Sequence, residues 1–268
     1  MAEISAALVK ELRDRTGAGM MDCKRALQET NGDMEAAIVL LREKGMASAA
    51  KRAGRETTEG KVGYRVAPDG SKGTMVAVGC ETEPVSNNDE FLAYAKKVLD
   101  VVEAKGVGAE SELDEERVEL SAKLGENIAV VGGARFEAVD AARISAYAHP
   151  PANKFGALVH LRGGDDDLGR KLGMQIVSLR PRWIGRDDVP AQVVTAEREI
   201  YHNSDEVQSK PEQAREKIVD GMLNKRFFGA SVLVDQEWIH DSSKSVGRAL
   251  QDAGAEVLEF ELFALSAR

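Results

Sequence analysis

The chain has 268 residues, of which 43% are hydrophobic and 30% are charged, and its formal net charge is −9. A chain of this length and apolar content can bury a core in one large domain or in two to three small ones, so wholesale disorder is not expected. The acidic balance also argues against a dedicated nucleic-acid-binding protein, because such proteins usually carry a basic face.

Membrane insertion, secretion and disulfide bonding are not expected either. No stretch approaches the roughly 18 uninterrupted apolar residues of a membrane-spanning helix, and the opening M-A-E-I-S lacks the pattern of a signal peptide. Cys23 and Cys80 are too few for a disulfide framework or a cysteine metal site. We expect both to be reduced packing residues of a cytoplasmic protein.

Residues 3–45 are predicted to form three helices. The first helix carries apolar residues at four-residue spacing, namely Ile4, Leu8 and Leu12. Glycines in the segment 16–19 end it, Asp22 is expected to cap the second helix, and Asp33 the third. Three helices in so few residues make a marginal core, so we expect this module to be supported by a neighbour or partner.

Residues 46–60 are small and charged, which indicates a helix tail or linker with a domain boundary near 54–60. Beyond it, two units each show a pair of short strands followed by a helix. The predicted strands are 62–66, 74–78, 144–148 and 157–161, and the predicted helices are 88–103 and 166–179. A helix over 114–124 and a strand near 134–137 lie between the units. This repetition favours an α+β fold with a duplicated core.

Residues 187–227 are mostly helical and charged, and two antiparallel helices are the simplest interpretation. A helix over 245–253 and a strand over 256–263 follow, so the helical pair is predicted to be inserted into the second unit. The expected domains are 1–54 (three-helix module and linker), 55–140 (first α+β unit) and 141–268 (second unit, with the hairpin 187–227 inserted).

The residue patterns do not support enzyme chemistry. The histidines are scattered and none has a cysteine or carboxylate at metal-ligand spacing; they are His149, His160, His202 and His240. The turn 17–19 lacks the remainder of a phosphate-binding loop. Asp165–Asp167 could ligate a divalent ion in a metal-dependent enzyme, but acidic residues also favour the start of a helix.

Several fragments carry a family resemblance. They are T-G-A-G-M-M-D-C-K-R-A-L at 16–27, N-G-D at 31–33, C-E-T at 80–82, L-S-A-K-L-G-E-N-I at 120–128, R-D-D-V-P at 186–190, K-P-E-Q near 210, and S-K-S-V-G-R-A-L-Q-D-A-G-A-E-V at 243–257. In this order they closely resemble the elongation factor Ts family of translation. The first fragment is the most specific, and together the fragments cover nearly the whole chain.

The resemblance implies a non-enzymatic guanine-nucleotide exchange factor that needs no cofactor or metal. Such a protein binds the GTPase domain of elongation factor Tu and disturbs its magnesium and phosphate sites, which promotes GDP release. Arg13, Met20, Met21 and Lys24 fall on positions that look like the family's docking face, and His149 falls on a contact position in the second unit. The methionines could instead fill the core, although two adjacent ones cannot both point inward, and the two cations could be solvated helix charges.

One segment departs from the family pattern. Where the family usually reads T-D-F-V, with Asp and Phe entering the GTPase near its magnesium site, this chain reads Thr82-Glu83-Pro84-Val85. Glu83 keeps the charge, whereas Pro84 removes the aromatic wedge and stiffens the loop. The wedge is then shorter, exchange is slower, or the remaining surface does most of the work; the sequence leaves the three open.

The resemblance also leaves alternatives. The three-helix module resembles ubiquitin-associated (UBA-like) bundles, so the chain could be an adaptor that binds elongation factor Tu without efficient exchange. The hairpin 187–227 resembles the family's dimerisation element, which makes a homodimer an open expectation beside a purely solvated hairpin. The chain stops at Arg268 soon after its last predicted strand, so a C-terminal extension that grips the partner is expected to be absent or reduced.

Overall fold

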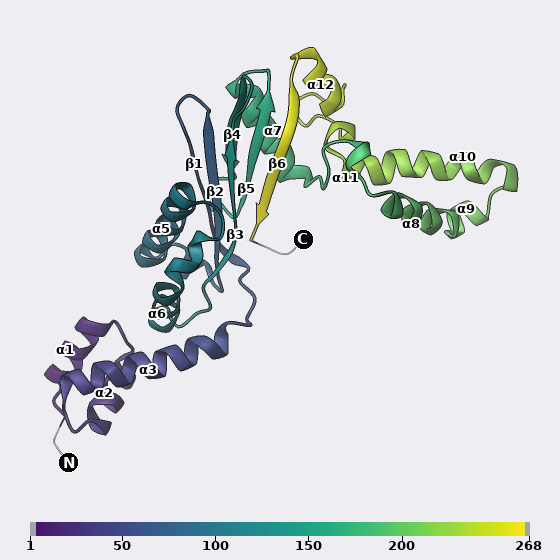
Figure 1. The fold of residues 1–268 in the computed structure, drawn as a ribbon. Coiled ribbons are helices and arrows are strands. Elements are labelled where there is room, and N and C mark those ends of the chain that lie inside the picture. The colour runs from purple at the N-terminus through teal and green to yellow at the C-terminus, as the bar shows by residue number, and fades with distance from the viewer. Residues whose placement is uncertain (1–3, 266–268) are drawn as a thin grey trace.

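The structure is a computed structural model that describes residues 4–265. Residues 1–3 and 266–268, to which the expectations about the signal peptide and the shortened C-terminus refer, lie outside the described residues. Two antiparallel three-stranded sheets, ordered β1-β2-β3 and β4-β5-β6, stand face to face with helices on both outer sides (Figure 1). The predicted α+β class is therefore confirmed.

The N-terminal part contains the three predicted helices. They are α1 (Ala6–Thr16), α2 (Met20–Glu29) and α3 (Met34–Arg52). Gly17 ends α1 in the left-handed conformation (φ 67°) and donates its N–H to the Arg13 carbonyl, a conformation that glycine adopts without strain. Asp33 caps α3 as predicted, because its carboxylate accepts the Ala36 N–H.

The expectation that Asp22 caps the second helix was wrong. The helix begins at Met20 with Gly19 as its extended N-cap residue, and the Cys23 N–H already bonds the Gly19 carbonyl. Asp22 lies in the first turn, where it pairs with Arg25. The flexible glycine therefore lets the helix start earlier than the acidic residue suggested.

The first sheet and its helices follow a short linker. The elements are β1 (Glu59–Val66), β2 (Lys72–Cys80), α4 (Glu83–Ser86), α5 (Asp89–Lys105), the 3₁₀ turn Ala109–Leu113, α6 (Asp114–Leu124) and β3 (Ala129–Glu137). The turn between β1 and β2 is closed by Asp69, whose carboxylate accepts the Ser71 N–H. Helix α5 covers the outer face of this sheet through Phe91, Val98 and Val102, all fully buried.

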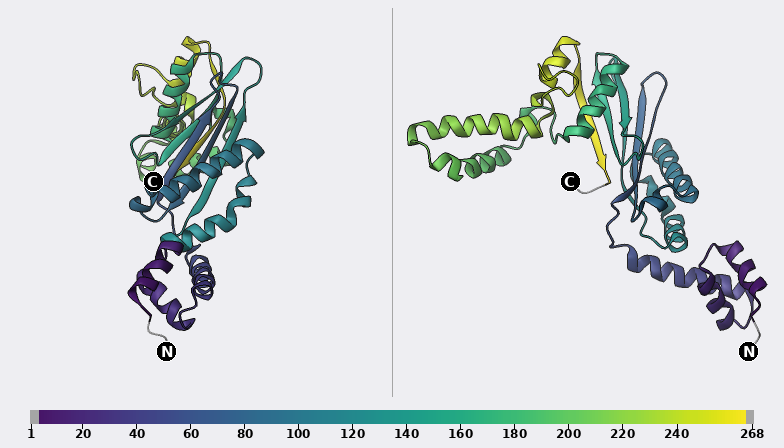
Figure 2. Two further views of the ribbon diagram at one scale, coloured as in Figure 1. Left: turned by 90° about the vertical axis from the view of Figure 1, so that its left-hand side faces the viewer. Right: turned by 180° about the vertical axis from the view of Figure 1, so that it is seen from behind.

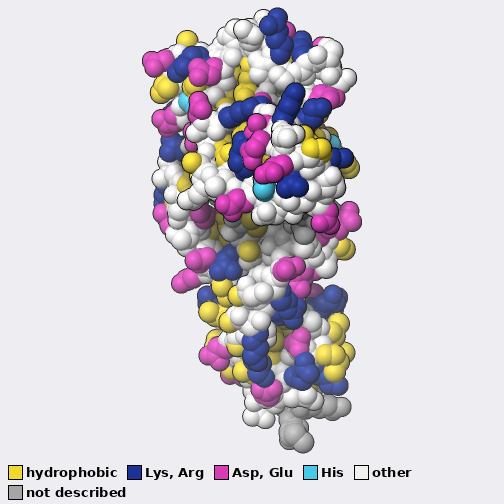
Figure 3. All heavy atoms as spheres, turned by 90° about the vertical axis from the view of Figure 1, so that its right-hand side faces the viewer, with side chains coloured by type: hydrophobic (Ala, Val, Ile, Leu, Met, Phe, Trp, Pro, Cys, Tyr) yellow, Lys and Arg dark blue, Asp and Glu magenta, His cyan; other side chains and the backbone are white. Residues whose placement is uncertain are grey.

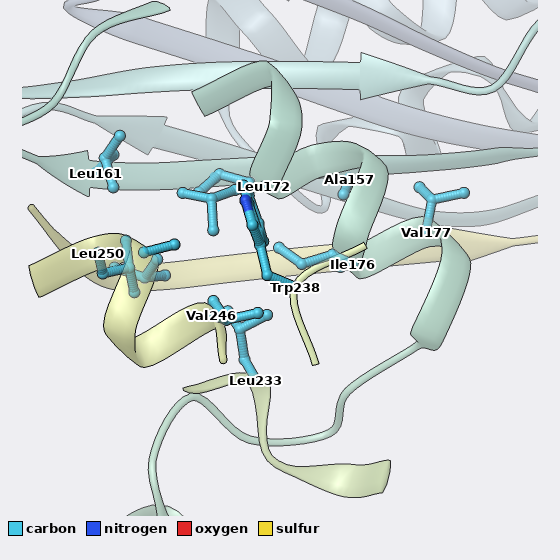
Figure 4. Close-up of a cluster of buried hydrophobic side chains, with 12 residues drawn as sticks. Ala157, Leu161, Leu172, Ile176, Val177, Leu233, Trp238, Val246 and Leu250 are labelled. Carbon is cyan, nitrogen blue, oxygen red and sulfur yellow. The ribbon is translucent and has the colours of Figure 1, made fainter. Parts of the chain in front are cut away.

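The second sheet has its own helical cover. Its elements are β4 (Ala142–Ala148), β5 (Phe155–Arg162), α7 (Asp166–Leu179), α12 (Val246–Asp252) and β6 (Glu256–Ala264). Figure 4 shows Trp238 lying among Leu172 and Ile176 of α7 and Val246 of α12. Leu179, the last residue of α7, is 42% exposed, because the next residue, Arg180, adopts the left-handed conformation and ends the helix.

Side chains from both inner faces form the core between the sheets. This core comprises Val62, Met75, Ala77, Ala134, Phe136, Ile144, Leu158, Phe263 and Leu265. Glycine allows the closest approach: a Cβ added at Gly73 would lie 2.3 Å from Ile144 Cγ2, and one at Gly156 would lie 2.6 Å from Val62 Cγ1. The sheets thus make one continuous body in which the ends of β2 and β5 are held in fixed relation.

A helical pair lies in sequence between α7 and α12, and it projects away from the sheets on the side opposite the N-terminal helices (Figures 1 and 2). Its elements are the 3₁₀ turn Arg186–Asp188, α8 (Ala191–His202), α9 (Asp205–Gln208), α10 (Glu212–Met222) and a π-helical turn Leu223–Phe228. α11 (Gly229–Ser231) and the 3₁₀ turn Leu233–Asp235 return the chain to the second sheet. The two antiparallel helices predicted over 187–227 correspond to α8 and α10 (Figure 1).

The N-terminal module is supported by the first unit, as its small core required. The C-terminal half of α3 packs on α6, where a Cβ added at Gly45 would meet the Ala122 Cβ at 2.9 Å. Arg52 also donates to the Ser121 carbonyl at 3.3 Å. Among residues 4–265, no helix is both long and apolar enough to cross a bilayer.

Candidate partner-binding site

Thr82-Glu83-Pro84-Val85 lies directly after β2, where the strand ladder ends with the pair Cys80–Glu59. Glu83 begins the single-turn helix α4, and Pro84 occupies its first turn, where the missing N–H costs nothing. Glu83 and Pro84 are exposed, while Val85 is half-buried against the core of the first unit. Glu83 and Pro84, the two residues that differ from the family pattern, thus face solvent on a short turn whose next residue packs on the core.

Glu126, just beyond α6, holds this turn in place. Its Oε2 accepts the backbone N–H groups of Glu81 and Thr82, each at 3.0 Å, and its Oε1 accepts the Thr82 hydroxyl. Bonds to an ionised acceptor are shorter and stronger than neutral ones. The carboxylate therefore replaces the strand partner that β2 loses at Cys80.

Glu81 makes the reverse connection. Its Oε1 accepts the Asn127 N–H at 2.6 Å, and its carboxylate pairs with Arg55 at 3.2 Å. The Asn127 N–H and then the Arg55 guanidinium hold the pKa of Glu81 below its ordinary value. Asn127 is itself buried and donates to the Arg55 carbonyl at 2.7 Å, so the linker is tied to the same cluster.

The neighbouring Cys80 is a packing residue. Burial, followed by the nearby charge of Glu126, raises the pKa of its thiol to about 12. The neutral Sγ lies 3.3 Å from the Thr82 carbonyl. Cys80 therefore packs beneath the turn as an apolar side chain and does not act as a nucleophile.

His149 lies in the loop between β4 and β5, and it is exposed. Its Nδ1 is 2.8 Å from the Tyr147 hydroxyl, which fixes the ring's orientation. Lys61 of β1 joins this loop to α4, because its Nζ donates to Asn87 Oδ1 at 2.9 Å and to the Ala152 carbonyl at 3.1 Å. The structure thus brings the Thr82–Val85 turn and the His149 loop to one end of the paired sheets.

The four remaining candidates lie on the N-terminal module. Arg13 on α1 and Met20, Met21 and Lys24 on α2 are all exposed. Met20 is 46% and Met21 63% exposed, so core filling by either methionine is excluded, and the inward residues of α2 are Cys23, Ala26 and Leu27.

These four residues do not join the other cluster. The module stands below the sheets at the far end of α3 in Figure 1. A groove of about 540 Å³ lies between the module and helices α5 and α6, and the ion pair between Arg42 of α3 and Glu119 of α6, at 2.5 Å, spans it. The candidate surface therefore has two parts, the N-terminal helices and the end of the sheets.

The acidic run Asp165–Asp167 has a structural role. Asp165 caps α7 by accepting the Leu168 N–H at 2.8 Å, Asp166 pairs with Arg143, and Asp167 pairs with Lys171. Within the described residues, no three His, Cys, Asp or Glu side chains gather closely enough to hold a metal ion. The α7 N-terminus, Arg143 and Lys171 thus supply the partners of these three carboxylates.

Sequence reasoning missed Glu81, Glu126, Asn127 and Lys61 as organisers of the site. Two of the quoted fragments, C-E-T at 80–82 and the G-E-N of 125–127, contain three of these residues. The signal was therefore present as a pair of distant fragments. The local sequence does not indicate that the two fragments meet.

Comparison with known proteins agrees with this arrangement of elements. The family model described as "Elongation factor TS" matches residues 81–267. The chain is 40% identical to elongation factor Ts of Methylococcus capsulatus over 97% of this chain and 91% of that protein. It is 43% identical to elongation factor Ts of Actinobacillus succinogenes over 98% of this chain and 91% of that protein. The chain belongs to the elongation factor Ts family, and it is a factor of the elongation phase of protein biosynthesis.

Proposed function

We propose that this chain binds elongation factor Tu carrying GDP and promotes GDP release by disturbing the magnesium and phosphate site of that GTPase. The observation that carries the proposal is the exposed Glu83-Pro84 turn, fixed by Glu126 beside the His149 loop. A rigid acidic projection of this kind is suited to enter a site that holds a cation and phosphates. No bond in the nucleotide is made or broken, so no catalytic residue or cofactor is assigned.

Exchange follows from reciprocal binding. If the chain binds the nucleotide-free GTPase more tightly than the GDP form by some factor, it must weaken GDP binding by the same factor. A coupling of about 1–3 kcal/mol corresponds to a change of roughly 5- to 150-fold. GTP, when more abundant than GDP, then refills the emptied site.

The N-terminal module supplies the second contact. We assign Arg13, Met20, Met21 and Lys24 to docking on the GTPase domain, since all four are exposed on α1 and α2. Flexible methionine side chains adapt to an apolar partner surface, and the cations favour an acidic rim. Docking on two separated parts of the chain would orient the Glu83-Pro84 turn toward the nucleotide.

Pro84 favours a second candidate, an adaptor that binds elongation factor Tu without efficient exchange. The ring of proline offers less apolar area than phenylalanine, whose burial contributes strongly at interfaces. In this reading Thr82, Glu83, Pro84 and Val85 contact the partner, but they do not displace its magnesium.

The two candidates differ in their preference for the nucleotide state. We would measure the affinity of the full chain for elongation factor Tu without nucleotide and with saturating GDP, by titration calorimetry. An exchange factor should bind the empty form roughly 5- to 150-fold more tightly than the GDP form, because it weakens GDP binding by the same factor. Equal affinities would support the adaptor, and no binding to either form would contradict both.

The finer features of the fold are part of the same proposal. We assign a UBA-like bundle and its linker to residues 1–54, a first α+β unit to 55–140 and a second to 141–268, with the hairpin 187–227 inserted. Duplication of the core is supported by the shared pattern of two antiparallel strands, a covering helix and a third strand paired with the second.

Self-association through the hairpin remains a proposal. Figure 3 shows Lys, Arg, Asp and Glu side chains intermixed on the face of the molecule toward which the hairpin projects. On the hairpin, Arg198 pairs with Glu216 and Asp220, and Ile200 is 61% exposed. Light scattering over a concentration series tests it: a dimer weakened by Ile200→Asp supports this interface, and a monomer at every concentration contradicts it.

A further inference from the structure

The geometry points to Glu126 as the residue that positions the Thr82–Val85 turn for exchange, an inference that rests on the proposed function. Glu126 is half-buried and lies behind the turn, whereas Glu83 and Pro84 are exposed in front of it. It is therefore a positioning residue that acts through the turn.

The contacts of Glu126 are concentrated on the two residues that lead into the turn. The strand ladder of β2 stops at Cys80, and the next two backbone N–H groups, of Glu81 and Thr82, both go to Oε2 of Glu126. Its Oε1 takes the Thr82 hydroxyl. One carboxylate thus fixes the direction in which the chain leaves the sheet just before Glu83.

The carboxylate itself stands on a fixed backbone. Gly125 ends α6 in the left-handed conformation (φ 76°) and donates its N–H to the Ser121 carbonyl. The Ser121 hydroxyl in turn donates to the Glu126 carbonyl at 2.5 Å. On the other side, the buried Asn127 is held by Glu81 and Arg55. The position of Glu126 is therefore set by α6, by the linker and by Glu81.

This arrangement explains how a turn without an aromatic residue can act on a partner. Pre-organisation lowers the conformational cost of binding, and small displacements of a positioned group can cost large factors in rate. Loss of the Glu126 contacts to Glu81 and Thr82 should therefore reduce the maximal rate of GDP release more than the affinity for the GDP-bound GTPase, because the N-terminal docking residues are unchanged.

The test compares four full-length proteins: the wild type, Glu126→Ala, Glu126→Gln and the control Glu115→Ala. Glu115 is an exposed residue of the same helix region, at the start of α6. Maximal rate and half-saturating GTPase·GDP concentration are measured by release of fluorescent GDP. Hydrogen exchange of the Glu81 and Thr82 amides is measured by NMR on the same proteins.

We expect Glu126→Ala to lower the maximal rate by roughly tenfold with little change in half-saturation, and to lose protection of both amides. Glu126→Gln should recover most of the rate, because one amide oxygen can still accept both N–H groups. Glu115→Ala should match the wild type. Thr82→Val, which removes only the hydroxyl contact, should give a smaller loss and serves if Glu126→Ala does not fold.

An unchanged maximal rate in Glu126→Ala with both amides deprotected would overturn the positioning role. If both amides stay protected in Glu126→Ala, the carboxylate of Glu126 does not hold them, and the inference is wrong. If the wild type does not accelerate GDP release, the proposed function fails and the positioning role fails with it. A failure of the proposed function is recognised because it is seen with the wild-type protein alone. Hydrogen exchange of the Glu81 and Thr82 amides would still report whether Glu126 accepts them.

Discussion

Glu81 and Glu126 hold each other's segments: Oε2 of Glu126 lies 3.0 Å from the Glu81 nitrogen, and Oε1 of Glu81 lies 2.6 Å from the nitrogen of Asn127, the residue after Glu126. These two hydrogen bonds join the end of β2 to the segment between α6 and β3. Because each carboxylate accepts backbone donors that the sheet leaves free, the exposed turn that follows is stabilised from behind.

This relationship predicts a pH dependence of stability at Glu81. The pKa of Glu81 is lowered by the Asn127 N–H and by Arg55, so its contribution is present above its ordinary value of 4.5 and is lost as the pH falls through the lower folded value. At pH 7, Glu81→Gln should lower the free energy of unfolding by roughly 1–2 kcal/mol. Urea denaturation of both proteins checks this.

The difference between wild type and Glu81→Gln should shrink as the pH falls below the ordinary carboxyl value, where the unfolded chain is protonated, and vanish below the lower folded pKa, where the folded carboxyl is protonated as well. The exposed Glu115→Gln serves as the control at each pH. A Glu81→Gln penalty that is the same at neutral and at strongly acidic pH would show that the charge of Glu81 contributes nothing.

Restoring an aromatic residue to the turn should speed exchange. Pro84→Phe adds a side chain that typically buries 150–250 Å² when it inserts into a partner. Because Pro84 is exposed, the substitution should leave the free energy of unfolding within about 0.5 kcal/mol of the wild type. We expect faster GDP release than with the wild type in the fluorescence assay, and no gain with Pro84→Ala. Equal rates of GDP release with the wild type, Pro84→Phe and Pro84→Ala would show that residue 84 does not contribute to exchange.

Met21 should act in docking and not in folding. Met21 is 63% exposed, so Met21→Ala should change the free energy of unfolding by less than about 0.5 kcal/mol. The same substitution at the fully buried Met75 should lower the free energy of unfolding by roughly 2–5 kcal/mol. In titrations with elongation factor Tu, Met21→Ala should weaken binding by about tenfold, which is the scale of an interface anchor.

Val39 provides the matched control for that titration, since it is 56% exposed on α3 of the same module. Val39→Ala should bind as the wild type does. If both variants weaken binding equally, the effect belongs to the module as a whole and the assignment of Met21 is wrong.

The close approach of the two sheets predicts a contrast between two glycines. A Cβ at Gly73 would lie 2.3 Å from Ile144 Cγ2 and 3.0 Å from Leu158 Cδ1, whereas one at Gly63 on the adjacent strand meets nothing within 4 Å. Gly73→Ala should cost about 1–3 kcal/mol through overpacking, and Gly63→Ala should be neutral or slightly stabilising. Thermal unfolding of both variants checks the contrast; equal melting temperatures would contradict tight packing at this point.

Much of the fold could be predicted from the sequence because its signals are local. The glycines of segment 16–19, the Asp33 cap and the predicted helices that correspond to α5 and α7 each depend on residues a few positions apart. The errors have the same origin. Asp22 is a good capping residue by type, but the preceding glycine let α2 begin earlier.

The organisation of the site could not be predicted in the same way. Glu81 and Glu126 are far apart in sequence, and their contact depends on α6 returning the chain to the end of β2. The link from Lys61 to the His149 loop likewise needs both sheets to be assembled. The sequence predicted Glu83, Pro84 and His149 as candidates through a family resemblance, and only the fold shows what supports them.

The most direct test is the release of fluorescent GDP from preloaded elongation factor Tu, with excess unlabelled nucleotide and catalytic amounts of this chain. We expect each molecule of the chain to release GDP from many molecules of the GTPase, at a rate that saturates with the concentration of the GDP complex. If GDP leaves at the spontaneous rate although the chain binds the GTPase, the exchange function is wrong and the chain is an adaptor.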